Sequence, residues 1–322
     1  MKKAFVSLYA LVVSMLTLCL PAASFARPFS ELIIFSGSLS DVGNYASVHG
    51  NFPPPFFNNR TTNGPNLDDV FAANLGFPNN PSLHLIGPAV GNNFAVFQAL
   101  AGGHGPEDLP AELDAYLNPH GGVADPDALF FIFIGGTEVI NAVLTPDDAV
   151  ASQILTDSVN GIETAFRRLV HAGAKRLLIP NFTDLGPLPF ARKFASPERA
   201  TRISLEFERK FQTMLNRTER DLKRDFDFEL IRWDFFEFAA GILRHADELG
   251  FTNTTDSCLD LLAAGQCDFD KFIFFNDFFP TAKVHKLIGN SLTQMIIERD
   301  KARCRKEGKK CDERDRREDD DR

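Results

Sequence analysis

The sequence predicts an α/β fold with a mainly parallel sheet, because short apolar runs alternate with longer stretches of helical periodicity along most of the chain. This alternation is typical of parallel sheets that are covered by helices on both faces. Since the carboxyl ends of parallel strands meet at one edge of a sheet, a ligand site is expected there. Strands are expected over 31–36, 128–134, 176–181 and 228–234, and helices over 148–171 and 197–224.

The first strand leads into the most informative turn of the chain. The run ELIIFS at 31–36 is apolar and is followed by Gly37, which predicts a buried strand that ends in a tight loop. Proline, asparagine and glycine are frequent over 51–66, so an irregular surface loop is expected until helical periodicity resumes at Leu67. The second strand, 128–134, closes on a pair of glycines in a similar way.

Composition and charge favour one globular domain over residues 27–299. Of the 322 residues, 44% are hydrophobic and 24% are charged, which supplies enough apolar side chain for a large core. The net charge is -9, and residues 27–299 hold 22 basic against 34 acidic side chains. An acidic body of this kind excludes the nucleic-acid-binding class, which depends on concentrated Lys and Arg. Residues 300–322 mix both signs without apolar periodicity and are expected to be a charged, disordered tail.

The first 26 residues have the pattern of a signal peptide. Lys2 and Lys3 precede an apolar run over 4–20, and small residues around Ala26 suit cleavage after that position. The mature protein is therefore expected to be secreted, in a periplasmic or extracellular location, without a stable membrane span. The alternative is an uncleaved membrane anchor, although the apolar run is slightly short for one.

Four cysteines remain once the signal segment is removed. An even number in a compartment that permits disulfides favours two bridges, and the pairs expected are Cys258 with Cys267 and Cys304 with Cys311. A zinc site is the alternative. No CxxC pattern and no neighbouring pair of histidines supports it, so no metal is expected.

Seven sequence blocks resemble one family of ester hydrolases. The run FSGSLSDVGN at 35–44 is similar to the FGDSLSDVGN block that names the GDSL, or SGNH, family. The likeness continues in the same order to residue 292, through FFNNRTTNGPN, GNNFAVFQALAGG, FFIFIGGTEVINA, RLLIPNFTDLGPLP, GFTNTTDSCL and FFNDFFPTAKVHKLIG. One short block is weak evidence, but seven in family order identify the chain as a member. The nearest pattern is that of the secreted lipase, acyltransferase and esterase branch.

The resemblance implies a fold, a ligand class and a set of site residues. The fold is a three-layer α/β/α arrangement of flavodoxin-like type with a five-stranded sheet, and it needs no cofactor. The expected ligand is a lipid or an acyl ester. Ser38 matches the nucleophile and Asp277 the acid that orients the base, while Ser38, Phe97 and Thr137 match the donors to the oxyanion.

Several of these positions depart from the family pattern. The aspartate that precedes the family's serine is Gly37, and a family glycine pair is replaced by Phe97 and Gln98 in the run GNNFAVFQALAGG. The family's asparagine is replaced by Thr137 in the run FFIFIGGTEVINA, and threonine offers a hydroxyl on a shorter arm. Losing one oxyanion donor lowers a rate by about 10² to 10³.

The largest departure lies at the general base. The family has Asp-x-x-His-Pro-Thr where this chain has DFFPT over 277–281, which is one residue shorter between the aspartate and the proline. Phe279, directly before Pro280, therefore occupies the position of the histidine. A phenyl ring neither takes a proton nor returns one, and loss of the base from a serine triad lowers the rate by roughly 10⁶. Without a histidine to orient, Asp277 is expected to cap the helix that follows.

Two other histidines are candidates for a substitute base. His285 lies six residues beyond the vacant position, on the following helix, where it is expected to point in a different direction. His104 lies in the glycine-rich loop AGGHG at 101–105, from which it could reach an active-site cleft, although histidines in such loops are more often solvated.

Three functions therefore remain open. The first is a secreted member of the ester-hydrolase class whose turnover is impaired but whose cleft still binds a lipid or acyl ester. The second is an active carboxylic-ester hydrolase that uses Ser38 with a substitute base. The third is a non-catalytic secreted module that binds a lipid or another partner. The sequence does not indicate an oligomeric state.

Overall fold

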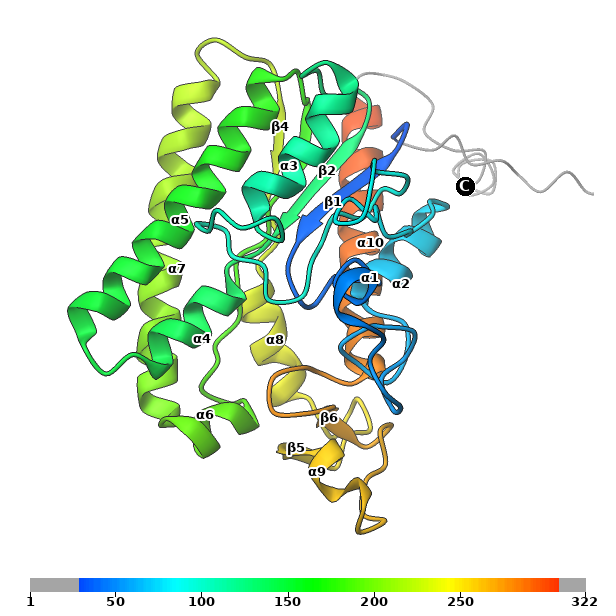
Figure 1. The fold of residues 1–322 in the computed structure, drawn as a ribbon, viewed down its shortest axis with the longest axis vertical. Helices are drawn as coiled ribbons and strands as arrows, with labels where there is room; N and C mark the ends of the chain where they lie inside the picture. Colours follow the sequence, from blue (N-terminus) through cyan, green and yellow to red (C-terminus); the bar gives the residue numbers. More distant parts are fainter. Residues whose placement is uncertain (1–28, 307–322) are drawn as a thin grey trace, which may run out of the picture.

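A computed structural model describes residues 29–306, and its main sheet has four parallel strands (Figure 1). The strand order is β1-β2-β3-β4. The strands are β1 (Leu32–Ser36), β2 (Leu129–Phe133), β3 (Arg176–Leu178) and β4 (Glu229–Ile231). This confirms the α/β class and the parallel sheet. The segment around Asn93 adds only an isolated parallel bridge to Ile34 beside β1, so the expected fifth strand is not present as a regular strand.

The register of the two central strands sets the position of the site. Leu32 pairs with Leu129 and Ser36 pairs with Phe133, so β1 and β2 end at the same level. All five residues of each strand are buried, as expected for a sheet covered on both faces. The loops that follow Ser36 and Phe133 therefore lie side by side at the carboxyl edge.

Helices cover the two faces of the sheet. In Figure 1, α3 lies in front of the central strands and α10 lies behind them. Helix α2 packs on α10, whereas α3, α4, α5 and α7 pack on one another. Their bounds are α2 (Leu67–Leu75), α3 (Leu109–Leu117), α4 (Gly136–Leu144), α5 (Asp148–His171), α7 (Pro197–Leu222) and α10 (Ala282–Lys306). The shorter elements are α1 (Ala46–His49), η1 (Asn118–His120), α6 (Pro189–Phe194) and α8 (Phe235–Arg244).

The two long helices begin at residues whose side chains cap them. The carboxylate of Asp147 accepts hydrogen bonds from the first backbone N–H groups of α5, and the Ser196 hydroxyl accepts one from Arg199 of α7. Proline at 197 fits the first turn of α7, where its missing N–H costs nothing. The expected helix over 148–171 is confirmed to the residue, and the one over 197–224 ends two residues early.

A small second sheet lies apart from the main one at the bottom of Figure 1. It consists of β5 (Asn253–Ser257) and β6 (Phe272–Phe274), with α9 (Cys258–Leu262) between them. The expected disulfide between Cys258 and Cys267 is present and closes this unit. Cys304 is half-buried on α10, and its expected partner Cys311 lies outside the described residues.

The ends of the chain are only partly covered by the structure. The expected signal peptide, 1–26, lies outside the described residues. Helix α10 continues to Lys306, across the expected boundary between domain and tail at 299, and residues 307–322 lie outside. Within 29–306, no helix combines the length and apolar character that crossing a bilayer requires.

Candidate active site

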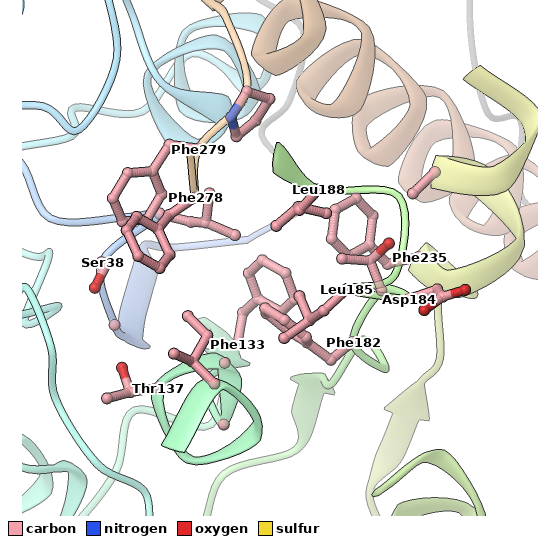
Figure 2. Close-up of a pocket in the computed structure, with 18 of the residues that line it drawn as sticks. Ser38, Phe133, Thr137, Phe182, Asp184, Leu185, Leu188, Phe235, Phe278 and Phe279 are labelled. Atoms are coloured by element: carbon pink, nitrogen blue, oxygen red, sulfur yellow. The ribbon is translucent and has the colours of Figure 1, made fainter. Parts of the chain in front are cut away.

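A cavity of about 400 Å³ opens at the carboxyl edge of β1 and β2. Ser38 and Thr137 lie at one end of it, and Asp184 and Phe235 lie at the other (Figure 2). Three phenyl rings form part of its wall: Phe133 lies 5.8 Å from Phe182 and 5.4 Å from Phe235, between ring centroids. Aliphatic side chains complete that wall, among them Ile140, Leu144, Leu185, Leu188, Ile242 and Leu243. The site is thus a mainly apolar pocket with a few polar groups at its ends.

Ser38 follows β1 directly and is half-buried at the edge of this cavity. Its Oγ atom accepts a hydrogen bond from the backbone N–H of Gln98 at 2.8 Å. Gln98 has a φ of 64°, in the left-handed region that favours glycine. The residue at this position therefore keeps a backbone conformation suited to glycine and aims its N–H at the serine oxygen.

The buried carboxylate of Asp41 holds the loop that carries Ser38. It accepts hydrogen bonds from the backbone N–H groups of Gly43 at 2.7 Å, Asn44 at 2.9 Å and Tyr45 at 3.2 Å, and from that of Phe97 at 2.8 Å. Burial raises the pKa of Asp41, and the four N–H groups partly oppose that rise. Asp41 thereby links the run 35–44, which carries Ser38, to the run 91–103, which carries Phe97.

Three further buried carboxyl groups lie behind the same loops. Glu112 accepts a hydrogen bond from the backbone N–H of Ser36 at 3.0 Å, and Glu138 accepts one from that of Ala101 at 2.5 Å. Asp68 is buried, and neither of its side-chain oxygens has a hydrogen-bond partner among the described residues. Burial raises the pKa of all three carboxyl groups. Glu112 and Glu138 thus hold backbone groups around the site from within the core.

Phe279, which the resemblance places at the position of the family's base, lines the cavity. Figure 2 shows it with Phe278 above Ser38. The ring centroids of Phe279 and Phe97 are 6.2 Å apart, and the backbone N–H of Phe279 donates to Asn276 at 2.9 Å. The side chain therefore adds to the apolar wall and offers no atom that accepts a proton.

Asp277 lies two residues before Phe279, whereas the family pattern has its acid three residues before the histidine, and Asp277 pairs with a lysine. Its Oδ1 atom accepts a hydrogen bond from Lys193 of α6 at 2.6 Å, and Lys193 also contacts Asp260 of α9. The expectation that Asp277 caps α10 is wrong, because the backbone N–H of Ala282 donates to Asn63 instead, at 2.9 Å. The carboxylate is thus one corner of an ion-pair cluster that joins three segments.

Neither candidate base reaches Ser38. His285 is fully buried, and its Nδ1 atom accepts a hydrogen bond from the backbone N–H of Leu67 at 3.1 Å. Burial lowers the pKa of this imidazole to about 3, so it is neutral under ordinary conditions. His104 is exposed in its loop. Neither residue is among those that line the cavity.

The expected oxyanion donors are only partly brought together. Thr137 is half-buried at the same end of the cavity as Ser38. The backbone N–H of Phe97 donates to Asp41, and it is the backbone N–H of Gln98 that donates to Ser38 Oγ. Gln98 was recognisable as the second member of the replaced glycine pair, but only the positive φ shows that its N–H faces the serine.

Metal binding has no obvious location in the part of the chain that the structure describes. Residues 29–306 contain no group of three or more His, Cys, Asp or Glu side chains arranged to hold an ion.

The chain is similar in sequence to known lipases, esterases and acyltransferases. The model of the GDSL-like lipase/acylhydrolase family matches residues 37–292. A GDSL esterase/lipase of Arabidopsis thaliana is 25% identical, over 83% of this chain and 89% of its own length. A phosphatidylcholine-sterol acyltransferase of Aeromonas hydrophila is 28% identical, over 80% of this chain and 72% of its own.

Among solved structures, an acetylxylan esterase of Geobacillus stearothermophilus aligns with a TM-score of 0.45 and 11% identity. The alignment covers 84% of this chain and 94% of that one. Because the family model covers most of the chain, the protein belongs to the GDSL family of lipases and acylhydrolases.

Proposed function

We propose that this chain is an exported GDSL-family protein that binds a lipid or acyl ester in its cavity and has lost most or all ester turnover. One observation carries the proposal. Among the described side chains that line the cavity, Asp184 carries the only carboxyl, imidazole or amino group, and it lies at the end opposite Ser38 (Figure 2).

Ester hydrolysis by a serine needs a group that takes the hydroxyl proton and later returns it to the leaving group. Asp184 is a poor candidate, because its two oxygens already accept hydrogen bonds from the backbone N–H of Gly186 and the hydroxyl of Thr201. Phe279 takes no part in proton transfer. The expected loss of rate is therefore the roughly 10⁶ that follows removal of a base, with little further loss from Thr137 since such effects do not add.

The same features favour ligand binding. A cavity of about 400 Å³ lies within the roughly 300 to 1,000 Å³ range of small-molecule sites. If each water-sized group takes about 30 Å³, this cavity accommodates on the order of a dozen heavy atoms. An acyl chain of medium length fits that volume and matches the apolar wall.

The active-esterase alternative receives less support. It requires His285 or His104 to approach Ser38, and the first is fixed in the core while the second lies in an exposed loop. The partner-binding alternative assigns binding to the charged residues 300–322, which we propose to be a tail beyond the domain at 27–299. Helix α10 includes the first seven of these residues.

Export is supported by two features. The first 26 residues have the pattern of a signal peptide, and the disulfide between Cys258 and Cys267 is of the kind that persists in oxidising compartments. Mass spectrometry of the protein secreted by its host tests this proposal. A mature chain that begins at Arg27 is expected, and retention of residues 1–26 would contradict it.

Two measurements on the purified mature chain test the proposed function. Hydrolysis of p-nitrophenyl octanoate should proceed at the same low rate for the wild type and Ser38→Ala. Octanoate should change the fluorescence of Trp233, the single tryptophan, whose ring stacks on Phe235 of the cavity wall at 5.4 Å. Turnover that depends on Ser38 overturns the loss of catalysis, and an unchanged fluorescence overturns the binding claim.

A further inference from the structure

A row of aromatic rings begins in the cavity and continues outside it. Phe279 and Phe97 both line the cavity, with ring centroids 6.2 Å apart. Phe97 also lies 5.5 Å from Phe52 and 5.1 Å from Tyr45, and neither of these two residues lines the cavity. We call Phe279, Phe97, Phe52 and Tyr45 the ring row. It passes Ser38 and leads away from the acyl cavity.

The ring row offers an apolar surface with little capacity for hydrogen bonding. All four side chains are half-buried, so each ring retains an accessible part. The Tyr45 hydroxyl is their only polar side-chain atom. Beyond Tyr45, the His49 ring stacks on the tyrosine at 4.1 Å and its Nε2 atom lies 2.6 Å from Oε1 of Glu107. A ligand with many hydroxyl groups would lose water there and gain few partners, which is costly.

We propose that the site binds esters of apolar alcohols, with the acyl chain in the cavity, the ester group at Ser38 and the alcohol on the ring row. This inference rests on the proposed function and adds the class of alcohol to it. An ester ligand has two arms that diverge from one carbonyl carbon. Ser38 lies where the two apolar surfaces meet, because Phe97 and Phe279 belong to both.

Two matched ligands test the class of alcohol. Hexyl octanoate and 6-O-octanoylglucose carry the same acyl chain on an alkyl or a sugar of six carbons. Their dissociation constants are measured through the fluorescence of Trp233 on the mature wild-type chain, with octanoate as the reference for the acyl arm alone. Hexyl octanoate is expected to bind at least tenfold more tightly than the glucose ester.

A pair of variants separates the ring row from general hydrophobicity. Phe52→Ser removes one ring outside the cavity. It should raise the dissociation constant of hexyl octanoate roughly five- to tenfold and leave that of octanoate unchanged. Phe57→Ser is the matched control, because Phe57 belongs to the same segment, is 38% exposed and is not part of the ring row. It should leave both dissociation constants unchanged. Circular dichroism checks that both variants are folded.

The outcomes distinguish this inference from the proposed function. The claim that the ring row binds an apolar alcohol is overturned if the two esters bind with equal affinity. It is also overturned if Phe52→Ser and Phe57→Ser change the binding of hexyl octanoate equally. Neither result affects the proposed binding of the acyl chain. If octanoate and both esters all fail to bind, the proposal that the cavity binds an acyl chain is wrong, and the inference about the alcohol is then wrong as well.

Discussion

The loop that carries Ser38 and the loop that carries Phe279 line the same cavity, yet different forces hold them. The Ser38 loop is fixed by buried carboxyl groups, with Asp41 accepting four backbone hydrogen bonds. The Phe279 loop is fixed by ring contacts, by the ion pair between Asp277 and Lys193, and by two backbone N–H groups that donate to the uncharged side chain of Asn276. The polar network at the serine therefore holds its loop through backbone hydrogen bonds, whereas Phe279 supplies a ring to the cavity and Asp277 pairs with Lys193.

The largest expected effect concerns the buried network of the first loop. Asp41→Ala leaves four backbone N–H groups without their acceptor and should lower the free energy of unfolding by about 4 kcal/mol. Asp277→Ala removes only a partly exposed ion pair and should lower it by less than about 1 kcal/mol. Urea unfolding followed by circular dichroism measures both. Similar losses for the two variants would remove the distinction between the loops.

A second prediction uses the pH dependence of stability. Burial raises the pKa of Asp68 well above its usual value, so above pH 4 the folded protein retains a proton that the unfolded chain has released. The free energy of unfolding therefore falls as the pH rises toward the folded pKa. Asp68→Asn carries no such proton. Between pH 5 and pH 8 its free energy of unfolding should therefore rise relative to that of the wild type by on the order of 1 to 2 kcal/mol.

Urea titrations at those two pH values give the difference. Asp41, Glu112 and Glu138 also have raised pKa values through burial, so the variant should flatten the wild-type slope without abolishing it. If the free energy of unfolding of Asp68→Asn falls with pH as steeply as that of the wild type, the Asp68 carboxyl group does not cause the pH dependence.

The smallest expected effect is at Gln98. Its φ of 64° costs a non-glycine residue about 1 to 2 kcal/mol, and glycine loses part of that gain through the greater entropy of its unfolded chain. Gln98→Gly should therefore raise the free energy of unfolding by up to about 1 kcal/mol. Gln98→Ala is the control, since it removes the same exposed side chain but keeps the unfavourable conformation. Equal effects of the two variants would rule out backbone strain at this position.

Sequence reasoning predicted the elements better than the contacts of the site. The strand that precedes Ser38 and the helix over 148–171 follow from apolar periodicity, which is a local property. The ion pair between Lys193 and Asp277 joins residues 84 positions apart, and no local pattern indicates it. The same holds for Asp41 as the acceptor for Phe97, 56 positions away. Such contacts depend on how loops fold over the sheet edge.

The fifth strand shows a different limit of the sequence. It was implied by family resemblance, but the segment beside β1 pairs through an isolated bridge at Asn93. Asparagine side chains there bind neighbouring backbone groups: the amide of Asn92 donates to the carbonyl of Leu32 at 2.7 Å. Side-chain bonds of this kind compete with a regular strand ladder.

Restoring a histidine at position 279 tests the central claim most directly. Phe279→His places an imidazole at the edge of the cavity, two residues from Asp277 and facing the end that holds Ser38 (Figure 2). Hydrolysis of p-nitrophenyl octanoate should rise at least about 100-fold over wild type. That gain should vanish in Phe279→His/Ser38→Ala. A wild-type chain that already hydrolyses the ester through Ser38 as fast as Phe279→His would contradict the account.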